Sequence, residues 1–133
     1  MRRVVAGCRE FAADFDRKKE NLLFTGSTGV GKTFLTNCIA KELIDSGHSV
    51  IYLSAGDLFE EFSRNKFDYD TPEDMRDTYR YILDCDLLII DDLGTELNNS
   101  FTSSQLFYCI NERMNMNRST IISTNLSLTQ LRD

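Results

Sequence analysis

The sequence predicts an α/β fold, in which a mostly parallel sheet is covered by helices on both faces. Segments that predict strands alternate with segments that predict helices along most of the chain, and this alternation is typical of α/β domains. Residues 87–90 are four consecutive apolar residues, which indicates a strand buried on both faces of a parallel sheet. Right-handed crossovers between such strands restrict the topology further.

Four strands are predicted from short runs of apolar and β-branched residues. Polar residues or glycine bound each run, and charged or turn-forming segments separate the runs from the predicted helices. The predicted strands are residues 21–25, 50–53, 87–90 and 119–124.

The predicted helices have apolar residues three or four positions apart, which places those residues on one face. The first helix covers residues 3–15, the second runs from near Lys32 to near Ser46, the third and fourth follow the caps Ser54 and Thr71, and the fifth follows the loop 93–100. Their apolar faces are Val4, Cys8, Phe11 and Phe15; Leu35, Ile39 and Leu43; Leu58, Phe59 and Phe62; Met75, Tyr79, Ile82 and Leu83; and Leu106, Phe107, Ile110 and Met114. Residues 64–70 are predicted to form a polar turn, and a last helix is predicted to begin at 127–130, so that the chain would stop just inside it.

The composition is that of one folded domain. The chain has 133 residues, of which 41% are hydrophobic and 27% charged. A net charge of −6 argues against a broad basic surface for duplex DNA, although a local basic groove stays open. No apolar run approaches the about 20 residues that a membrane span needs, and no signal peptide is recognisable, so we expect a cytoplasmic protein without a membrane partner.

We interpret the cysteines (Cys8, Cys38, Cys85 and Cys109) as buried thiols, and His48 as a solvated loop residue.

Residues 26–33, with the sequence GSTGVGKT, match the pattern G-x-x-x-x-G-K-[ST] of a phosphate-binding loop. The pattern lies between a predicted strand and a predicted helix, which is the context it requires. Glycines allow successive backbone N–H groups to point at phosphate oxygens, and the helix that follows adds its positive end. Lys32 would contact the β- and γ-phosphates, and the Thr33 hydroxyl would ligate Mg²⁺. The predicted nucleotide-binding residues are Gly26, Ser27, Thr28, Gly29, Val30, Gly31, Lys32, Thr33 and Phe34.

Polar residues follow two later strands. Asp91 and Asp92 come directly after the apolar run, at the strand end where ligands bind in open α/β sheets. Asp91 fits the carboxylate that holds Mg²⁺, directly or through water, and Asp92 is a candidate to orient or activate the attacking water. Asn125 follows the fourth strand, where its amide could contact the γ-phosphate or that water; the alternative is an ordinary turn residue.

These three motifs resemble those of the AAA+ ATPases of the bacterial helicase-loader group, which comprises DnaC, DnaI and the transposition helper IstB. The resemblance covers the chain from about residue 10 onward. It implies a P-loop NTPase of three layers whose five strands have the spatial order 5-1-4-3-2. It assigns catalytic or phosphate-sensing roles to Lys32, Asp91 (Walker B) and Asn125 (sensor 1), with ATP or ADP and Mg²⁺ as cofactors. Residues 1–133 would then be one nucleotide-binding core, cut after the sensor 1 strand and without the lid domain.

The resemblance also implies partners, namely a replicative DNA helicase, single-stranded DNA and further copies of the chain in a head-to-tail arrangement with an arginine finger. Asp92 stands where the wider superfamily has a catalytic glutamate, so we expect weak or absent hydrolysis, which Glu96 could partly restore. Arg113 could face a neighbouring subunit; the alternative is an exposed helix arginine. Without strand 5, the strand at 21–25 should be a sheet edge, with the N-terminal helix or another molecule near it.

Several functions fit these features. The leading hypothesis is the ATPase core of a helicase loader, in which the nucleotide state controls assembly and contact with single-stranded DNA. Alternatives are an IstB-like transposition helper ATPase and a nucleotide-controlled binding module with little hydrolysis. A P-loop kinase is a weaker alternative, because no acceptor site or kinase lid is recognisable.

Overall fold

The structure is a computed structural model that describes residues 7, 11–12, 15, 21–25, 30–66, 73–94 and 99–124. It confirms the strand–helix alternation. The strands are β1 (Leu22–Phe24), β2 (Val50–Ser54), β3 (Leu87–Leu93) and β4 (Ser119–Thr124), and the helices are α2 (Val30–Asp45), α3 (Ala55–Lys66), α4 (Glu73–Asp84) and α5 (Ser100–Asn115).

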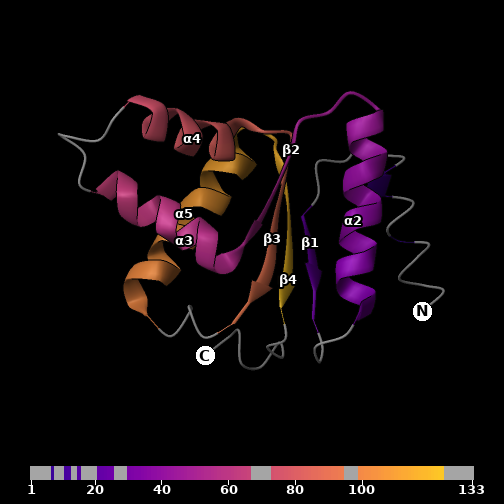
Figure 1. Cartoon of the computed structure of the whole chain (residues 1–133), viewed down its shortest axis with the longest axis horizontal. Coiled ribbons are helices and arrows are strands. Elements are labelled where there is room, and N and C mark those ends of the chain that lie inside the picture. Colours follow the sequence, from indigo (N-terminus) through magenta and orange to yellow (C-terminus); the bar gives the residue numbers. More distant parts are fainter. Residues whose placement is uncertain are drawn as a thin grey trace.

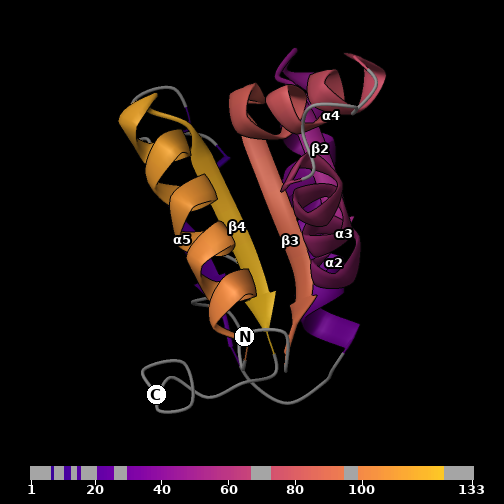
Figure 2. The same cartoon turned by 90° about the vertical axis from the view of Figure 1, so that its left-hand side faces the viewer.

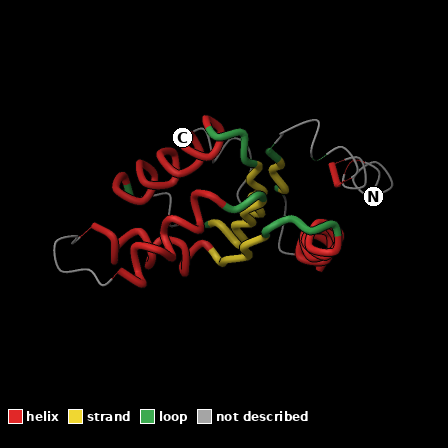
Figure 3. Tube along the Cα trace, turned by 90° about the horizontal axis from the view of Figure 1, so that it is seen from above, coloured by secondary structure: helices red, strands yellow, loops and turns green. Residues whose placement is uncertain are grey.

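The strands form one parallel sheet in the order β1-β4-β3-β2. This is the 1-4-3-2 part of the expected spatial order. Helix α2 covers one face, and α3, α4 and α5 cover the other (Figure 1). Seen from above, the strands form a central layer with helices on either side (Figure 3). The predicted three-layer α/β fold is therefore correct.

Alternation along β3 explains why its first four residues, 87–90, are all apolar. Leu87 and Ile89 belong to the core on the α2 side, whereas Leu88 and Ile90 belong to the core under α3, α4 and α5. All four side chains are fully buried. A buried side chain of this size contributes about 1.5–3 kcal/mol, so β3 is the hydrophobic centre of the domain.

Helix α2 ends just before Gly47, as the glycine at that position predicts. Gly47 has φ +87, a conformation that a side chain disfavours. The N–H of His48 donates to the Leu43 carbonyl at 2.9 Å and the N–H of Gly47 to the Ile44 carbonyl at 3.0 Å. This is a Schellman motif, which satisfies the last carbonyls of the helix and turns the chain toward β2.

The apolar face of α5 differs from the predicted one. Leu106 is buried and Ile110 is partly buried, but Phe107 is 62% exposed and Met114 is 54% exposed. The core face is instead made by Leu106, Cys109 and, unexpectedly, Arg113. A spacing of three or four residues allowed either face, and no local pattern predicts an arginine on the buried one.

The N-terminal residues reach the α2 side of the sheet. Residues 7, 11 and 12 are helical, and the Phe11 and Phe15 side chains are buried in the cluster that contains Leu22 and Phe24 of β1. In the described part of the chain, β1 pairs with β4 alone. Both the edge position of β1 and the nearby N-terminal segment were predicted.

Other local expectations were wrong. The imidazole of His48 is not freely solvated, because it stacks edge-on against Phe15 with ring centroids 4.9 Å apart. Cys85 and Cys109 are buried thiols as predicted, but Cys38 is exposed, and Cys8 lies outside the described residues. Residues 64–66 continue α3 rather than forming a turn, and the predicted helix start at 127–130 is also outside the described part. None of the helices described combines the length and the apolar character needed to cross a membrane.

Candidate nucleotide-binding site

Lys32 lies in the first turn of α2, next to the carboxyl edge of the sheet. Its Nζ donates a hydrogen bond to the backbone carbonyl of Thr124, the last residue of β4, at 2.8 Å. The first turn of α2 contains no acidic residue, so the positive end of the helix is not neutralised there. A cationic side chain and a positive helix end thus meet where a phosphate group would be held.

Strand β3 runs beside β4 (Figure 2), and Asp91 and Asp92 are near its carboxyl end. The pairing of β3 with β4 is irregular between Ile90 and Leu93, and Asp92 has φ +59. This left-handed conformation costs a non-glycine residue about 1–2 kcal/mol, and aspartate tolerates it better than most. At this irregularity the two carboxylates lie in different environments: Asp91 is partly buried and Asp92 is exposed.

Thr124 connects the two strand ends at this edge. Its hydroxyl donates to the Leu93 carbonyl at 2.5 Å, and its own carbonyl accepts the bond from Lys32. Thr124 therefore fixes the end of β4 against β3 and α2 together. Thr124 could not be identified from the sequence, because only the strand register shows that it is the contact of Lys32.

Tyr52 of β2 is a second residue that the sequence analysis missed. Its hydroxyl donates to Oδ2 of Asp91 at 2.6 Å. Burial is the main cause that raises the pKa of Tyr52 above 10.0, and the bond to Asp91 and the charge of that carboxylate act in the same direction. A hydrogen bond with Thr36 of α2 has the opposite, smaller effect. The phenol is thus a neutral donor to Asp91 at physiological pH.

The structure brings Lys32, Asp91, Tyr52 and Thr124 to one edge of the sheet. Residues 26–29 and Asn125 lie outside the described residues, as do the side chains of Val30 and Thr33, although Val30, Gly31 and Thr33 belong to the first turn of α2. Phe34 is 63% exposed in the same turn region. Glu96 is also outside the described part.

These residues fit a magnesium–nucleotide complex. Mg²⁺ is usually bound by one or two carboxylates, with phosphates and water completing its shell, and not by a cage of protein ligands. In the described residues, no group of three or more His, Cys, Asp or Glu side chains gathers into a metal site. Asp91 at the end of β3 and Lys32 at the start of α2 lie at the same edge of the sheet, where one carboxylate and a nucleotide could share the metal.

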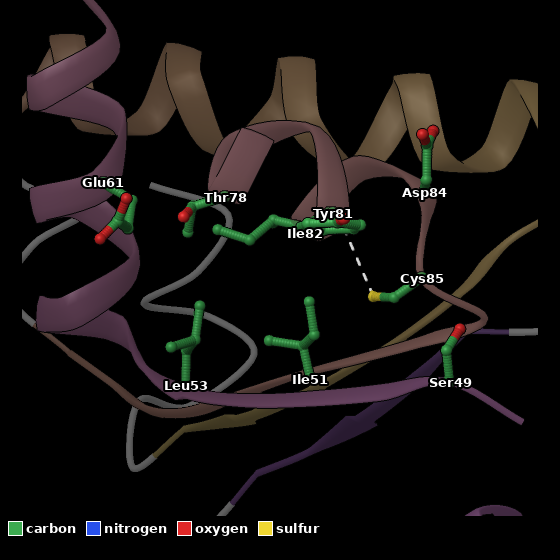
Figure 4. Close-up of a pocket in the computed structure, with 9 residues that line it drawn as sticks. All are labelled: Ser49, Ile51, Leu53, Glu61, Thr78, Tyr81, Ile82, Asp84 and Cys85. Atoms are coloured by element: carbon green, nitrogen blue, oxygen red, sulfur yellow. Dashed lines mark hydrogen bonds between the residues drawn. The ribbon is translucent and has the colours of Figure 1, made fainter. Parts of the chain in front are cut away.

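A separate hollow lies on the opposite face of β2. It has a volume of about 590 Å³ and is lined by Ile51, Leu53 and Ile82, with Glu61 and Asp84 among its polar residues. Ile51 and Leu53 point into it from β2 (Figure 4). Because side chains alternate along a strand, Tyr52 between them points the other way, toward α2 and Asp91. The hollow is therefore not part of the candidate phosphate site.

Arg113 is neither exposed nor available to a neighbouring subunit. Its side chain is fully buried, so both interpretations made from the sequence were wrong. The guanidinium donates to carbonyls at the end of α4 and the start of β4, including those of Ile82 at 2.7 Å and Ser119 at 2.6 Å. Burial lowers its pKa from the ordinary value, and burial also raises the pKa of the nearby Cys109 thiol to about 11. Arg113 is thus a structural residue that joins α4, α5 and β4.

Comparison with known proteins agrees with this geometry. Residues 3–133 match the family described as IstB-like ATP binding protein. The chain is 25% identical to the replicative helicase loader DnaC of Buchnera aphidicola subsp. Baizongia pistaciae over 98% of its length and 53% of that protein's. It therefore spans about half the length of this curated relative.

Two solved structures share the fold. The crystal structure of the DnaC helicase loader superposes with a TM-score of 0.78 at 30% identity, over 96% of this chain and 71% of that one. AMPPCP-bound DnaA from Aquifex aeolicus gives 0.79 at 21% identity, over 94% of this chain and 38% of that one, which is a likeness of fold alone. The chain therefore belongs to the IstB-like ATP binding proteins, in the AAA+ group that includes the DnaC and DnaI helicase loaders.

Proposed function

We propose that this chain is the ATP-binding core of a replicative helicase loader, and that it binds ATP or ADP with Mg²⁺ at the carboxyl edge of its sheet. The observation that carries the proposal is the placement of Lys32 and Asp91 at that edge, on α2 and β3, two elements that Thr124 joins through its bonds to Lys32 and Leu93. The kinship with DnaC, which is named a replicative helicase loader, supports the biological role.

Each residue has a defined task in this proposal. The backbone of residues 26–31 would surround the phosphates, Lys32 would exchange the Thr124 carbonyl for the β- and γ-phosphates, and Phe34 would contact the nucleotide. Thr33 and Asp91 are the residues that would hold Mg²⁺, which neutralises charge on the phosphate oxygens when bound. Asn125, directly after Thr124, senses the γ-phosphate.

Hydrolysis depends on Asp92. Its side chain is exposed and shorter than glutamate, so it positions an attacking water less closely than the glutamate of the wider superfamily. We propose weak ATP turnover, with Glu96 as a secondary candidate. A chain that binds ATP tightly but releases ADP at the background rate would instead be a nucleotide-controlled binding module.

The partners in this proposal are a hexameric replicative helicase, single-stranded DNA and further copies of the chain. The test mixes the protein with the replicative helicase of its host, with and without ATP, and weighs the complexes by light scattering. A discrete complex that responds to nucleotide supports the loader. Intact ATP binding without any complex favours a transposition helper, the second role that the family match allows.

Replacing Asp91 with asparagine should weaken ATP binding in the presence of Mg²⁺ by about tenfold or more, because the neutral amide is a poorer ligand for a hard cation. Binding in the presence of EDTA should change little, because Asp91 contacts the metal and not the phosphates. Titration with a fluorescent ATP analogue measures both. Asp84→Asn is the matched control, since Asp84 is exposed at the opposite, amino end of β3. Equal losses with and without Mg²⁺ would remove Asp91 from the metal site.

A further inference from the structure

Tyr52 lies between two parts of the candidate site, namely Asp91 on β3 and the helix α2. It lies on β2, the strand next to β3, and its neighbours Ile51 and Leu53 face the other side of the sheet. Tyr52 is paired with Ile89, two residues before Asp91, so its long side chain runs diagonally toward the strand end. The hydroxyl reaches Oδ2 of Asp91 at 2.6 Å. This distance is typical of a hydrogen bond to an ionised carboxylate.

The same hydroxyl is connected to the phosphate-loop helix. A side-chain hydrogen bond links it to Thr36. Thr36 is fully buried in α2, one turn after Lys32 and three residues after Thr33. The hydrogen bonds thus run from Thr36 through Tyr52 to Asp91, across three elements of the fold.

The bond from Tyr52 leaves one oxygen of Asp91 available. In the described part of the chain, Oδ2 accepts the phenol and Oδ1 has no hydrogen-bond partner. A carboxylate with one oxygen held by the protein is restricted in its orientation, so its other oxygen would offer a metal or its water a fixed ligand. Outer partners of this kind orient ligands and commonly change metal affinity by about 10–100-fold.

We infer that Tyr52 is a positioning residue, which orients the Asp91 carboxylate for Mg²⁺ and ties that orientation to the phosphate-loop helix through Thr36. The inference rests on the proposed nucleotide function and adds to it. Tyr52 does not touch the nucleotide itself. Its effect passes through Asp91, so its loss should change the response to Mg²⁺ and not the affinity for the nucleotide alone.

The test replaces Tyr52 with phenylalanine, which removes only the hydroxyl. Binding of a fluorescent ATP analogue is measured while Mg²⁺ is raised from zero. We expect the Mg²⁺ concentration for half-maximal effect to rise about tenfold, while affinity in EDTA stays within about twofold of wild type. Tyr108→Phe is the control, because Tyr108 is 54% exposed on α5, and α5 covers the face of the sheet opposite to α2.

A Thr36→Val substitution tests the connection to α2. It keeps the shape of the side chain and should shift the Mg²⁺ response in the same direction by a smaller factor. Combined with Tyr52→Phe, it should add little, because both changes interrupt one hydrogen-bonded chain. Thermal unfolding of each variant shows whether the fold is kept; Tyr52→Phe decides the matter even where Thr36→Val does not fold.

The outcomes separate this inference from the function on which it rests. An unchanged or tighter Mg²⁺ response in folded Tyr52→Phe, beside an impaired Asp91→Asn, overturns the role of Tyr52 and leaves the nucleotide site intact. Equal losses with and without Mg²⁺ overturn it as well, since they indicate a general structural effect. Wild-type protein that binds nucleotide without any response to Mg²⁺ overturns the proposed metal site and this inference together.

Discussion

Replacing Lys32 with alanine is expected to abolish binding of nucleoside triphosphate, with affinity falling by at least about 100-fold. The lysine is the one cationic side chain that the structure places at the carboxyl edge of the described sheet, at the start of α2. Hydrogen bonds to charged groups are worth about 1.5–3 kcal/mol each, and a lysine between two phosphates makes more than one. A loss of two such bonds corresponds to more than 100-fold in affinity.

The fold should survive this change. In the protein without nucleotide, Lys32 is partly buried and its bond to the Thr124 carbonyl contributes about 1 kcal/mol, so a fall in melting temperature of only a few degrees is expected. Lys41→Ala is the matched control, because Lys41 is an exposed lysine farther along the same helix. Titration with a fluorescent ATP analogue and circular dichroism measure the two effects. Unchanged ATP affinity in folded Lys32→Ala would contradict the site assignment.

The parts of the site that the sequence predicted are those with a local signal. Glycine spacing, a lysine before a hydroxyl and an apolar run that ends in aspartates can all be recognised without knowing how strands pair. The same holds for the end of α2, since Gly47 marks a helix end by its conformational freedom alone. The spacing of apolar residues and the positions of turn-forming residues were therefore sufficient to predict the layers of the fold and the order of its elements.

The parts that the sequence could not predict depend on register between distant segments. Tyr52 is 39 residues from Asp91, and Lys32 is 92 residues from Thr124. Only the pairing of β2 with β3 shows that a tyrosine in an otherwise apolar strand points at a carboxylate. Strand alternation could have placed Tyr52 on the α2 face, opposite Ile51 and Leu53, but it could not have named its partner.

Arg113 is the residue whose environment the sequence predicted least well, because a charged side chain is expected to be exposed and this one is buried. The cost of burying its charge is offset by hydrogen-bond acceptors from three segments of the chain. The guanidinium reaches Oγ1 of Thr120 at 3.0 Å and carbonyls of Ile82, Leu83, Asp86 and Ser119, and a further bond goes to Sγ of Cys85 at 3.3 Å. None of these acceptors in the described residues is a carboxylate. Neutral carbonyls at the end of α4 hold the charge because the helix end is negative.

Replacing Arg113 with methionine should therefore lower the free energy of unfolding by about 3–5 kcal/mol, a large share of the about 5–15 kcal/mol that holds a typical domain together. The methionine fills part of the volume but removes the guanidinium's hydrogen bonds to the carbonyls of Ile82 and Ser119, and a hydrogen bond to a charged group is worth about 1.5–3 kcal/mol. Arg113→Lys should fall between wild type and methionine, because one ammonium cannot reproduce the planar fork. Urea unfolding followed by circular dichroism measures the three proteins.

Arg118→Met is the matched control for this prediction. Arg118 lies five residues farther along, is 37% exposed and forms an ion pair with Asp86 at 2.8 Å. Exposed pairs of this kind contribute about 0–1 kcal/mol, so its loss should be small. A loss at Arg113 no larger than the loss at Arg118 would mean that the buried guanidinium is dispensable. The predicted difference arises because Asp86, whose side chain is 28% exposed, keeps access to water when Arg118 is replaced, whereas the buried carbonyls around Arg113 do not.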